Sequence, residues 1–108
     1  SNYGVLFYID SDGNEISNYG LILQINSVDI YPNEKYLVVG TTGSKHIYAS
    51  KKSPPGGYTW SYSPDFGGEY EYGRSGKVTN DEGAIVVGHD VLGNIYLIKL
   101  DRFGDSIE

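Results

Sequence analysis

Short apolar runs separated by turn residues recur along the whole chain. The run at 36–41 is dominated by valine and is too short for a stable helix. The segment 58–62 alternates aromatic with small polar residues, which is typical of a strand with two different faces. The pattern predicts strands at 28–31, 36–41, 46–51, 58–62, 77–79, 84–88 and 95–101, joined by turns rich in proline, glycine and asparagine.

The chain also repeats itself. Residues 35–56 and 83–104 align without a gap at a shift of 48, and the identities fall on strand positions and turn glycines: Val38/Val86, Val39/Val87, Gly40/Gly88, Ile47/Ile95, Tyr48/Tyr96, Lys51/Lys99 and Gly56/Gly104. Residues 9–16 resemble 100–107 once one residue of slack is allowed, which makes a third, partial copy. We therefore expect the end of one unit at 1–20, a complete unit at 21–63 and a following unit at 64–108.

Four short antiparallel strands in each unit predict an all-β fold built from β-propeller blades, with about two and a half blades in this chain. A strand-rich sandwich is the main alternative, but it does not require an ungapped shift. Propellers need about four blades to close. We therefore expect the chain either to be part of a longer protein or to assemble from several copies.

Composition narrows the class of protein. The chain of 108 residues has 15 glycines, 11 tyrosines and no cysteine, which suits strands and tight turns and rules out disulfides. A net charge of −6 argues against nucleic-acid binding, because phosphate binding needs a cationic face. No apolar run is long enough to span a bilayer and no signal peptide is visible, so we expect no membrane insertion.

The segment 27–40, which is a strand, a Tyr-Pro-Asn-Glu-Lys turn and a strand ending in glycine, resembles a blade of quinoprotein-like and Trp-Asp-type β-propellers. Residues 60–104 are similar to repeats of bacterial and archaeal surface propellers. The resemblance implies a fold and loops displayed for binding, and it implies no catalytic residues. The Gly-His and Trp-Asp dipeptides of Trp-Asp repeats are missing, and only one glycine and Trp60 match the quinone-docking pattern, so no cofactor is expected.

Two groups of residues suggest chemistry. Asp10, Asp12 and Asn14 alternate as calcium ligands do, but the EF-hand spacing fails at Glu15 and Leu21, and a hairpin turn is the favoured interpretation. His89 beside Asp90 suggests an acid/base pair, yet the sequence supplies no matching nucleophile.

The segment between Trp60 and Lys77 is acidic and aromatic, and we expect it to form a loop between blades. This segment and the adjacent His89 and Asp90 contribute the predicted ligand-facing residues, which are Glu69, Tyr70, Glu71, Tyr72, His89 and Asp90. Carboxylates beside aromatic rings can bind or hydrolyse sugars.

The sequence therefore predicts a non-enzymatic structural or binding module, at the cell surface or outside the cell. A carbohydrate-binding or glycoside-acting propeller and an intracellular protein-interaction scaffold are the alternatives. The expected partners are protein, either further blades or other copies of the chain, and carbohydrate.

Overall fold

The computed structural model describes residues 4–9, 15–21, 23–53, 57–64 and 70–106. All regular structure in these ranges is β-strand, as the pattern predicts: β1 (Gly4–Ile9), β2 (Glu15–Leu21), β3 (Leu23–Ile30), β4 (Tyr36–Thr42), β5 (Ile47–Ser53), β6 (Gly57–Tyr62), β7 (Glu71–Val78), β8 (Ala84–Asp90) and β9 (Ile95–Leu100). No helix able to cross a membrane occurs in these segments.

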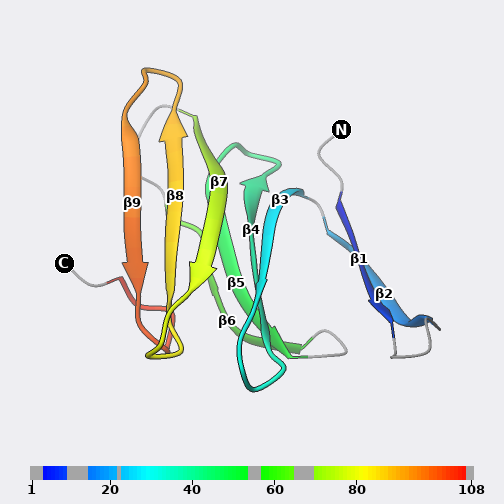
Figure 1. Ribbon diagram of the computed structural model, residues 1–108. Coiled ribbons are helices and arrows are strands. Elements are labelled where there is room, and N and C mark those ends of the chain that lie inside the picture. The colour runs from blue at the N-terminus through cyan, green and yellow to red at the C-terminus, as the bar shows by residue number, and fades with distance from the viewer. Residues whose placement is uncertain (1–3, 10–14, 22, 54–56, 65–69, 107–108) are drawn as a thin grey trace.

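The strands form three antiparallel sheets in chain order, namely β1-β2, β3-β4-β5-β6 and β7-β8-β9. In Figure 1 the four-stranded sheet lies between the other two, and β7 approaches β3 and β4. The connections are short, so each strand pairs with the strand that precedes it in its own sheet.

Most strands occupy the predicted segments, but β3 and β7 begin earlier than predicted. Strand β3 starts at Leu23 and β7 at Glu71, whereas the pattern indicated 28 and 77. A β-bulge interrupts each strand, between Ile25 and Ser27 in β3 and between Gly73 and Ser75 in β7. The extra residue breaks the alternation of apolar and polar positions, so the first half of each strand gives no strand signal.

The shift of 48 also relates the backbone of the two larger sheets. The pairs Leu23↔Thr42 and Ile25↔Gly40 correspond to Glu71↔Asp90 and Gly73↔Gly88, and the bulges fall at corresponding positions. Positive φ angles correspond as well, at Glu34 (70°) and Glu82 (65°), and at Lys45 (68°) and Gly93 (90°). The β3-β4 and β7-β8 hairpins therefore share register, bulge and turn geometry.

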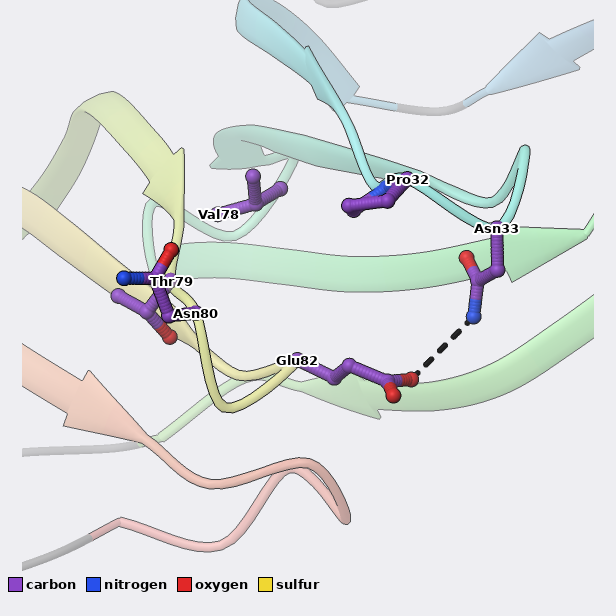
Figure 2. Close-up of a pocket in the computed structure, with 6 residues that line it drawn as sticks. All are labelled: Pro32, Asn33, Val78, Thr79, Asn80 and Glu82. Atoms are coloured by element: carbon purple, nitrogen blue, oxygen red, sulfur yellow. Dashed lines mark hydrogen bonds between the residues drawn. The ribbon is translucent and has the colours of Figure 1, made fainter.

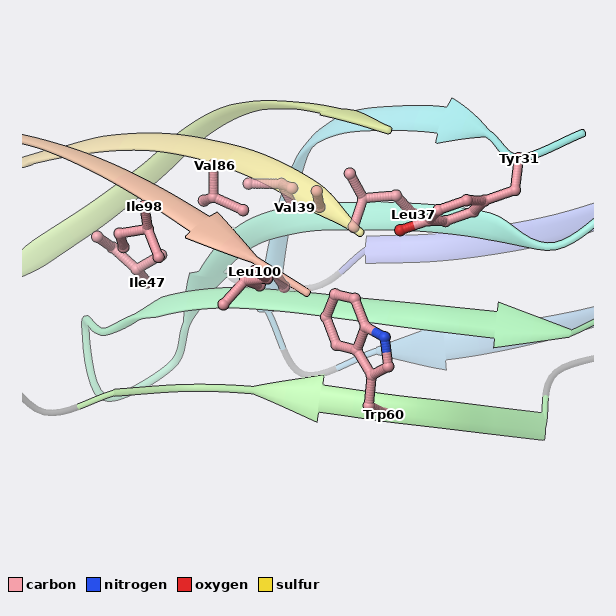
Figure 3. Packing of buried hydrophobic residues seen from close by; sticks show 10 residues of the cluster. Tyr31, Leu37, Val39, Ile47, Trp60, Val86, Ile98 and Leu100 are labelled. Atoms are coloured by element: carbon pink, nitrogen blue, oxygen red, sulfur yellow. The ribbon is translucent and has the colours of Figure 1, made fainter. Parts of the chain in front are cut away.

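The core lies between these two sheets, as Figure 3 shows. The four-stranded sheet contributes Leu37, Val39, Ile47 and Ala49, and each is fully buried. The edge strand of the same sheet adds Trp60, and the turn after β3 adds Tyr31. The facing sheet contributes Ala84, Val86, Ile98 and Leu100. Burying a large aliphatic side chain stabilises a fold by about 1.5–3 kcal/mol, so this shared core joins the two sheets energetically.

Glycines in β7 allow the two sheets to approach closely. A Cβ atom at Gly73 would collide with the carbonyl oxygen of Gly40, and one at Gly76 would collide with the side chain of Val39. Ser27 and Asn26 add hydrogen bonds across the gap, where Asn26 Nδ2 donates to the Gly73 carbonyl at 2.6 Å. Strand β7 is glycine-rich because it is the strand in contact with the neighbouring sheet.

Candidate functional site

The predicted ligand-facing residues that the structure describes lie together at one end of the sheet β7-β8-β9. Glu71 pairs with Asp90 and Tyr72 pairs with His89 in the β7-β8 ladder. Tyr70 is next to them, because its carbonyl accepts a hydrogen bond from the Val91 amide at 3.3 Å. This end is at the top of Figure 1, and we call it the histidine end. Glu69 lies outside the described residues.

The sequence suggested that Glu71 lies in a loop, and this prediction was wrong. Glu71 is a buried residue of β7. Its side chain is in contact with His46, since its Oε1 lies 3.3 Å from Nδ1 of that ring, and its amide donates to the Lys45 carbonyl at 2.9 Å. The residue is 1% exposed. Glu71 therefore joins β7 to the turn between β4 and β5, and its carboxylate faces the protein.

Asp90 holds together the turn that follows β8. Its carboxylate accepts hydrogen bonds from the amides of Leu92 (3.0 Å) and Asn94 (2.9 Å), from Asn94 Nδ2 (2.9 Å) and from the Tyr96 hydroxyl (3.2 Å). The Asn94 side chain and these other donors lower the pKa of Asp90, because they stabilise its charged form. The carboxylate is thus fully engaged by its own hairpin.

His89 belongs to a cluster on the outward side of the sheet. Arg74 Nε donates to His89 Nε2 at 2.8 Å, and His89 Nδ1 lies 3.1 Å from the Asp90 carbonyl oxygen. These contacts fit a ring that carries its proton on Nδ1. The Tyr72 ring completes the cluster, with its centroid 5.4 Å from that of His89 and 5.5 Å from Arg74 Cζ.

This geometry does not form the acid/base pair suggested by the adjacent histidine and aspartate. His89 contacts the backbone carbonyl of Asp90, while the carboxylate is directed into the turn. A histidine oriented by a carboxylate is the arrangement that general-base catalysis commonly uses. The exposed parts of the histidine end are instead an aromatic and cationic surface made of Tyr70, Tyr72, Arg74 and His89.

A hollow of about 230 Å³ lies at the opposite end of the sheets, between the β3-β4 turn and the β7-β8 turn. Figure 2 shows its lining, where Asn33 Nδ2 donates to Glu82 Oε1 at 3.2 Å, and the lining residues are Pro32, Asn33, Val78, Thr79, Asn80 and Glu82. The sequence analysis missed this hollow, although its two turns occupy corresponding positions at the shift of 48. Recognising it required the knowledge that corresponding turns lie side by side.

Lys51 is buried close to these turns and connects the two sheets. Its Nζ donates to the Glu82 carbonyl at 2.9 Å and lies 4.3 Å from the centroid of the Tyr31 ring. Burial lowers the pKa of Lys51 and raises that of Tyr31, whose hydroxyl donates to the Gly83 carbonyl at 2.9 Å. Lys51 from β5 and Tyr31 from the turn after β3 therefore hold the β7-β8 turn against the four-stranded sheet.

The suggested calcium ligands Asp10, Asp12 and Asn14 lie outside the described residues. Among the residues that are described, no group of three or more histidine, aspartate or glutamate side chains is arranged to hold a metal ion.

Comparison with models of protein families and with curated protein sequences gives no match to this chain.

Proposed function

We propose that this chain is a segment of a β-propeller and acts as a non-enzymatic structural or binding module at the cell surface or outside the cell. The observation that supports the proposal best is the correspondence of register, bulge and turn between two consecutive sheets packed face to face. Propellers are built from consecutive antiparallel sheets of this kind. The surface location is favoured by the acidic, tyrosine-rich and cysteine-free composition.

A binding role fits the side chains at the histidine end better than catalysis does. Glu71 and Asp90 are engaged by contacts within the protein, and His89 is held by Arg74 and a backbone carbonyl. Tyr70 is 56% exposed beside this cluster, so the surface offers an aromatic ring, a guanidinium and an imidazole. Such groups recognise partners by stacking and hydrogen bonding.

The propeller proposal can be tested with tandem copies of the 48-residue unit 36–83. Ring closure removes both open sheet edges at once, so we expect one copy number at which resistance to urea rises sharply. A circular permutant with that same copy number serves as the control, because a closed ring tolerates a new starting point. A steady rise in stability with every added copy would indicate an open solenoid and would contradict the proposal.

Carbohydrate binding is the second candidate, and the exposed ring of Tyr70 next to Tyr72 and Arg74 favours it. Aromatic rings stack on sugar faces, while guanidinium groups donate to hydroxyls. On a glycan array we expect binding that Tyr70→Ala weakens at least tenfold. Phe103→Ala is the matched control, because Phe103 is an aromatic residue at the other end of the sheet and is 72% exposed, more than Tyr70. Equal binding by both variants would exclude Tyr70 from a sugar site.

A further inference from the structure

The outward side of the sheet β7-β8-β9 is an apolar surface without a cover among the described residues. Its centre is formed by Ile85, Ile95 and Leu97, which are 37%, 72% and 73% exposed. Register places Ile85 beside Lys99 and Val87 beside Leu97. We call this surface the open face.

The corresponding surface of the four-stranded sheet is completely covered. At the shift of 48, Ile85, Ile95 and Leu97 correspond to Leu37, Ile47 and Ala49, and each of these three is 0% exposed. They are buried by the sheet β7-β8-β9, which approaches mainly through β7. The structure thus shows what kind of surface covers this set of positions, namely the first strand of another sheet.

The strand that corresponds to β7 is β3, and its outer residues are exposed. Val28 and Ile30 are 52% and 68% exposed, and they correspond to Gly76 and Val78, which pack against the four-stranded sheet. We call Val28 and Ile30 the β3 strip. The open face and the β3 strip therefore correspond to parts of the two surfaces that meet once inside the chain.

Polar residues at the two surfaces also match. Inside the chain, Lys51 reaches the carbonyl and the carboxylate of Glu82, at 2.9 and 3.8 Å. Lys99 on the open face corresponds to Lys51, and the exposed Glu34 beside the β3 strip corresponds to Glu82. Ser75 likewise corresponds to Ser27, whose hydroxyl bonds to Gly76 across the internal contact.

Two differences limit how closely the internal contact can be reproduced. Tyr36, Val38 and Ser50 stand at the positions of Ala84, Val86 and Ile98 in the internal contact, and they are already 8%, 0% and 0% exposed, so only the strip itself is free for a second copy. Val28 stands at the position of Gly76, where a Cβ atom would collide with Val39. Two surfaces that both carry side chains must lie farther apart than β7 and β4 do, at a spacing nearer the ~10 Å of ordinary packed sheets. The contact between copies is therefore expected to be looser than the internal contact.

We propose that the open face of one copy of this chain binds the β3 strip of a second copy, head to tail. The inference rests on the proposed function only in using the same correspondence between the two sheets. Because the two surfaces differ, each bound copy leaves one surface free, and the assembly grows until it closes into a ring or continues as an open chain.

Sedimentation velocity from micromolar to millimolar concentration tests the proposal on the 108-residue chain. We expect species of at least twice the monomer mass to appear as concentration rises. Leu97→Lys on the open face and Ile30→Lys on the β3 strip should each abolish them, because both place a charge in an apolar contact. Phe103→Lys, an exposed residue outside both surfaces, should leave them unchanged.

Mixing the two variants gives the decisive measurement. Each variant keeps the surface that the other has lost, so an equimolar mixture of the Leu97→Lys and Ile30→Lys chains should form a one-to-one dimer and nothing larger. A wild-type chain that stays monomeric, an Ile30→Lys chain that still associates, or a mixture that stays monomeric would each overturn the proposal. Circular dichroism of each variant verifies its fold, and the tandem-copy experiment tests the propeller independently of association.

Discussion

Asp29 is one of the carboxylates that make the stability of the chain depend on pH. Its Oδ2 accepts the Val78 amide of the neighbouring sheet at 2.9 Å, and this bond lowers the pKa of Asp29 below its ordinary 3.8. A carboxyl whose pKa is lower in the folded state stabilises the fold above the unfolded pKa and loses that effect as pH falls through the folded pKa.

We therefore expect Asp29→Asn to lower the free energy of unfolding at pH 7 and to lower it progressively less as pH falls below the ordinary pKa of 3.8. Urea unfolding of the variant and of the wild type at several pH values measures this difference. Asp105→Asn is the control, because Asp105 is an exposed acid away from the sheet contact. A constant difference at all pH values would show that the charge of Asp29 has no role.

Gly73 tests whether the close approach of the two sheets is required. A methyl group there collides with the Gly40 carbonyl, so we expect Gly73→Ala to lower the free energy of unfolding by about 1–3 kcal/mol or more. Gly93→Ala is the matched control, because its Cβ atom would meet nothing within 4 Å and only its positive φ of 90° is strained. The control should cost about 1 kcal/mol, as Lys45 tolerates the corresponding conformation. Equal losses measured by urea unfolding would contradict the collision argument.

At the scale of elements, Trp60 attaches the edge strand β6 to the turn after β9. Its Nε1 donates to the Arg102 carbonyl at 3.1 Å, and its ring packs on Gly104, where a Cβ atom would lie 2.7 Å from the indole. Gly104 also has a φ of 84°, a backbone conformation that residues other than glycine rarely adopt. This turn is therefore shaped around the tryptophan.

We expect Gly104→Ala to displace the indole and to lower the free energy of unfolding by about 2–4 kcal/mol, because collision and backbone strain add. Trp60 is the only tryptophan and is buried, so its fluorescence should shift to the red in the folded variant. Phe103→Ala in the same turn is the control and should leave the emission unchanged. An unshifted spectrum for Gly104→Ala would show that the turn does not hold the indole.

The strands that the sequence predicted well are those whose own residues determine their structure. Strands β4, β5, β8 and β9 contain apolar residues that are buried in the core, so their pattern is visible without knowledge of their neighbours. Most of strand β7 was not predicted, because it contains Gly73 and Gly76. Both glycines are required by the close approach of the four-stranded sheet, where a Cβ atom would collide. In a single sequence, glycine predicts a turn. Only the tertiary contact shows why a strand contains it.

The same distinction applies to the candidate site. Tyr70, Tyr72 and His89 are residue types suited to binding, and the β7-β8 register together with the bond from the Val91 amide to the Tyr70 carbonyl brings them together. The burial of Glu71 against His46 depends on a contact between two sheets, and the hollow beside Asn33 and Glu82 depends on two turns meeting. Contacts between sheets therefore decided which residues face solvent, and local pattern could not reveal them.

At the scale of the whole molecule, corresponding positions differ in what covers them. Leu37 is fully buried, whereas Ile85, its counterpart at the shift of 48, is 37% exposed. Removing a buried leucine side chain costs about 2–5 kcal/mol, because apolar contact is lost and a cavity remains. In dilute solution we expect this loss for Leu37→Ala and a loss of less than about 1 kcal/mol for Ile85→Ala.

The same pair of substitutions reports whether the two sheets unfold together. Because Leu37 lies in the core that both sheets share, Leu37→Ala should move the unfolding transitions seen by Trp60 fluorescence and by far-ultraviolet circular dichroism to lower urea by the same amount. Separate transitions would show that each sheet unfolds alone. At concentrations where copies associate, Ile85→Ala should become more costly, since the open face is then covered. A cost for Ile85→Ala that does not change with concentration would mean that Ile85 stays exposed to solvent.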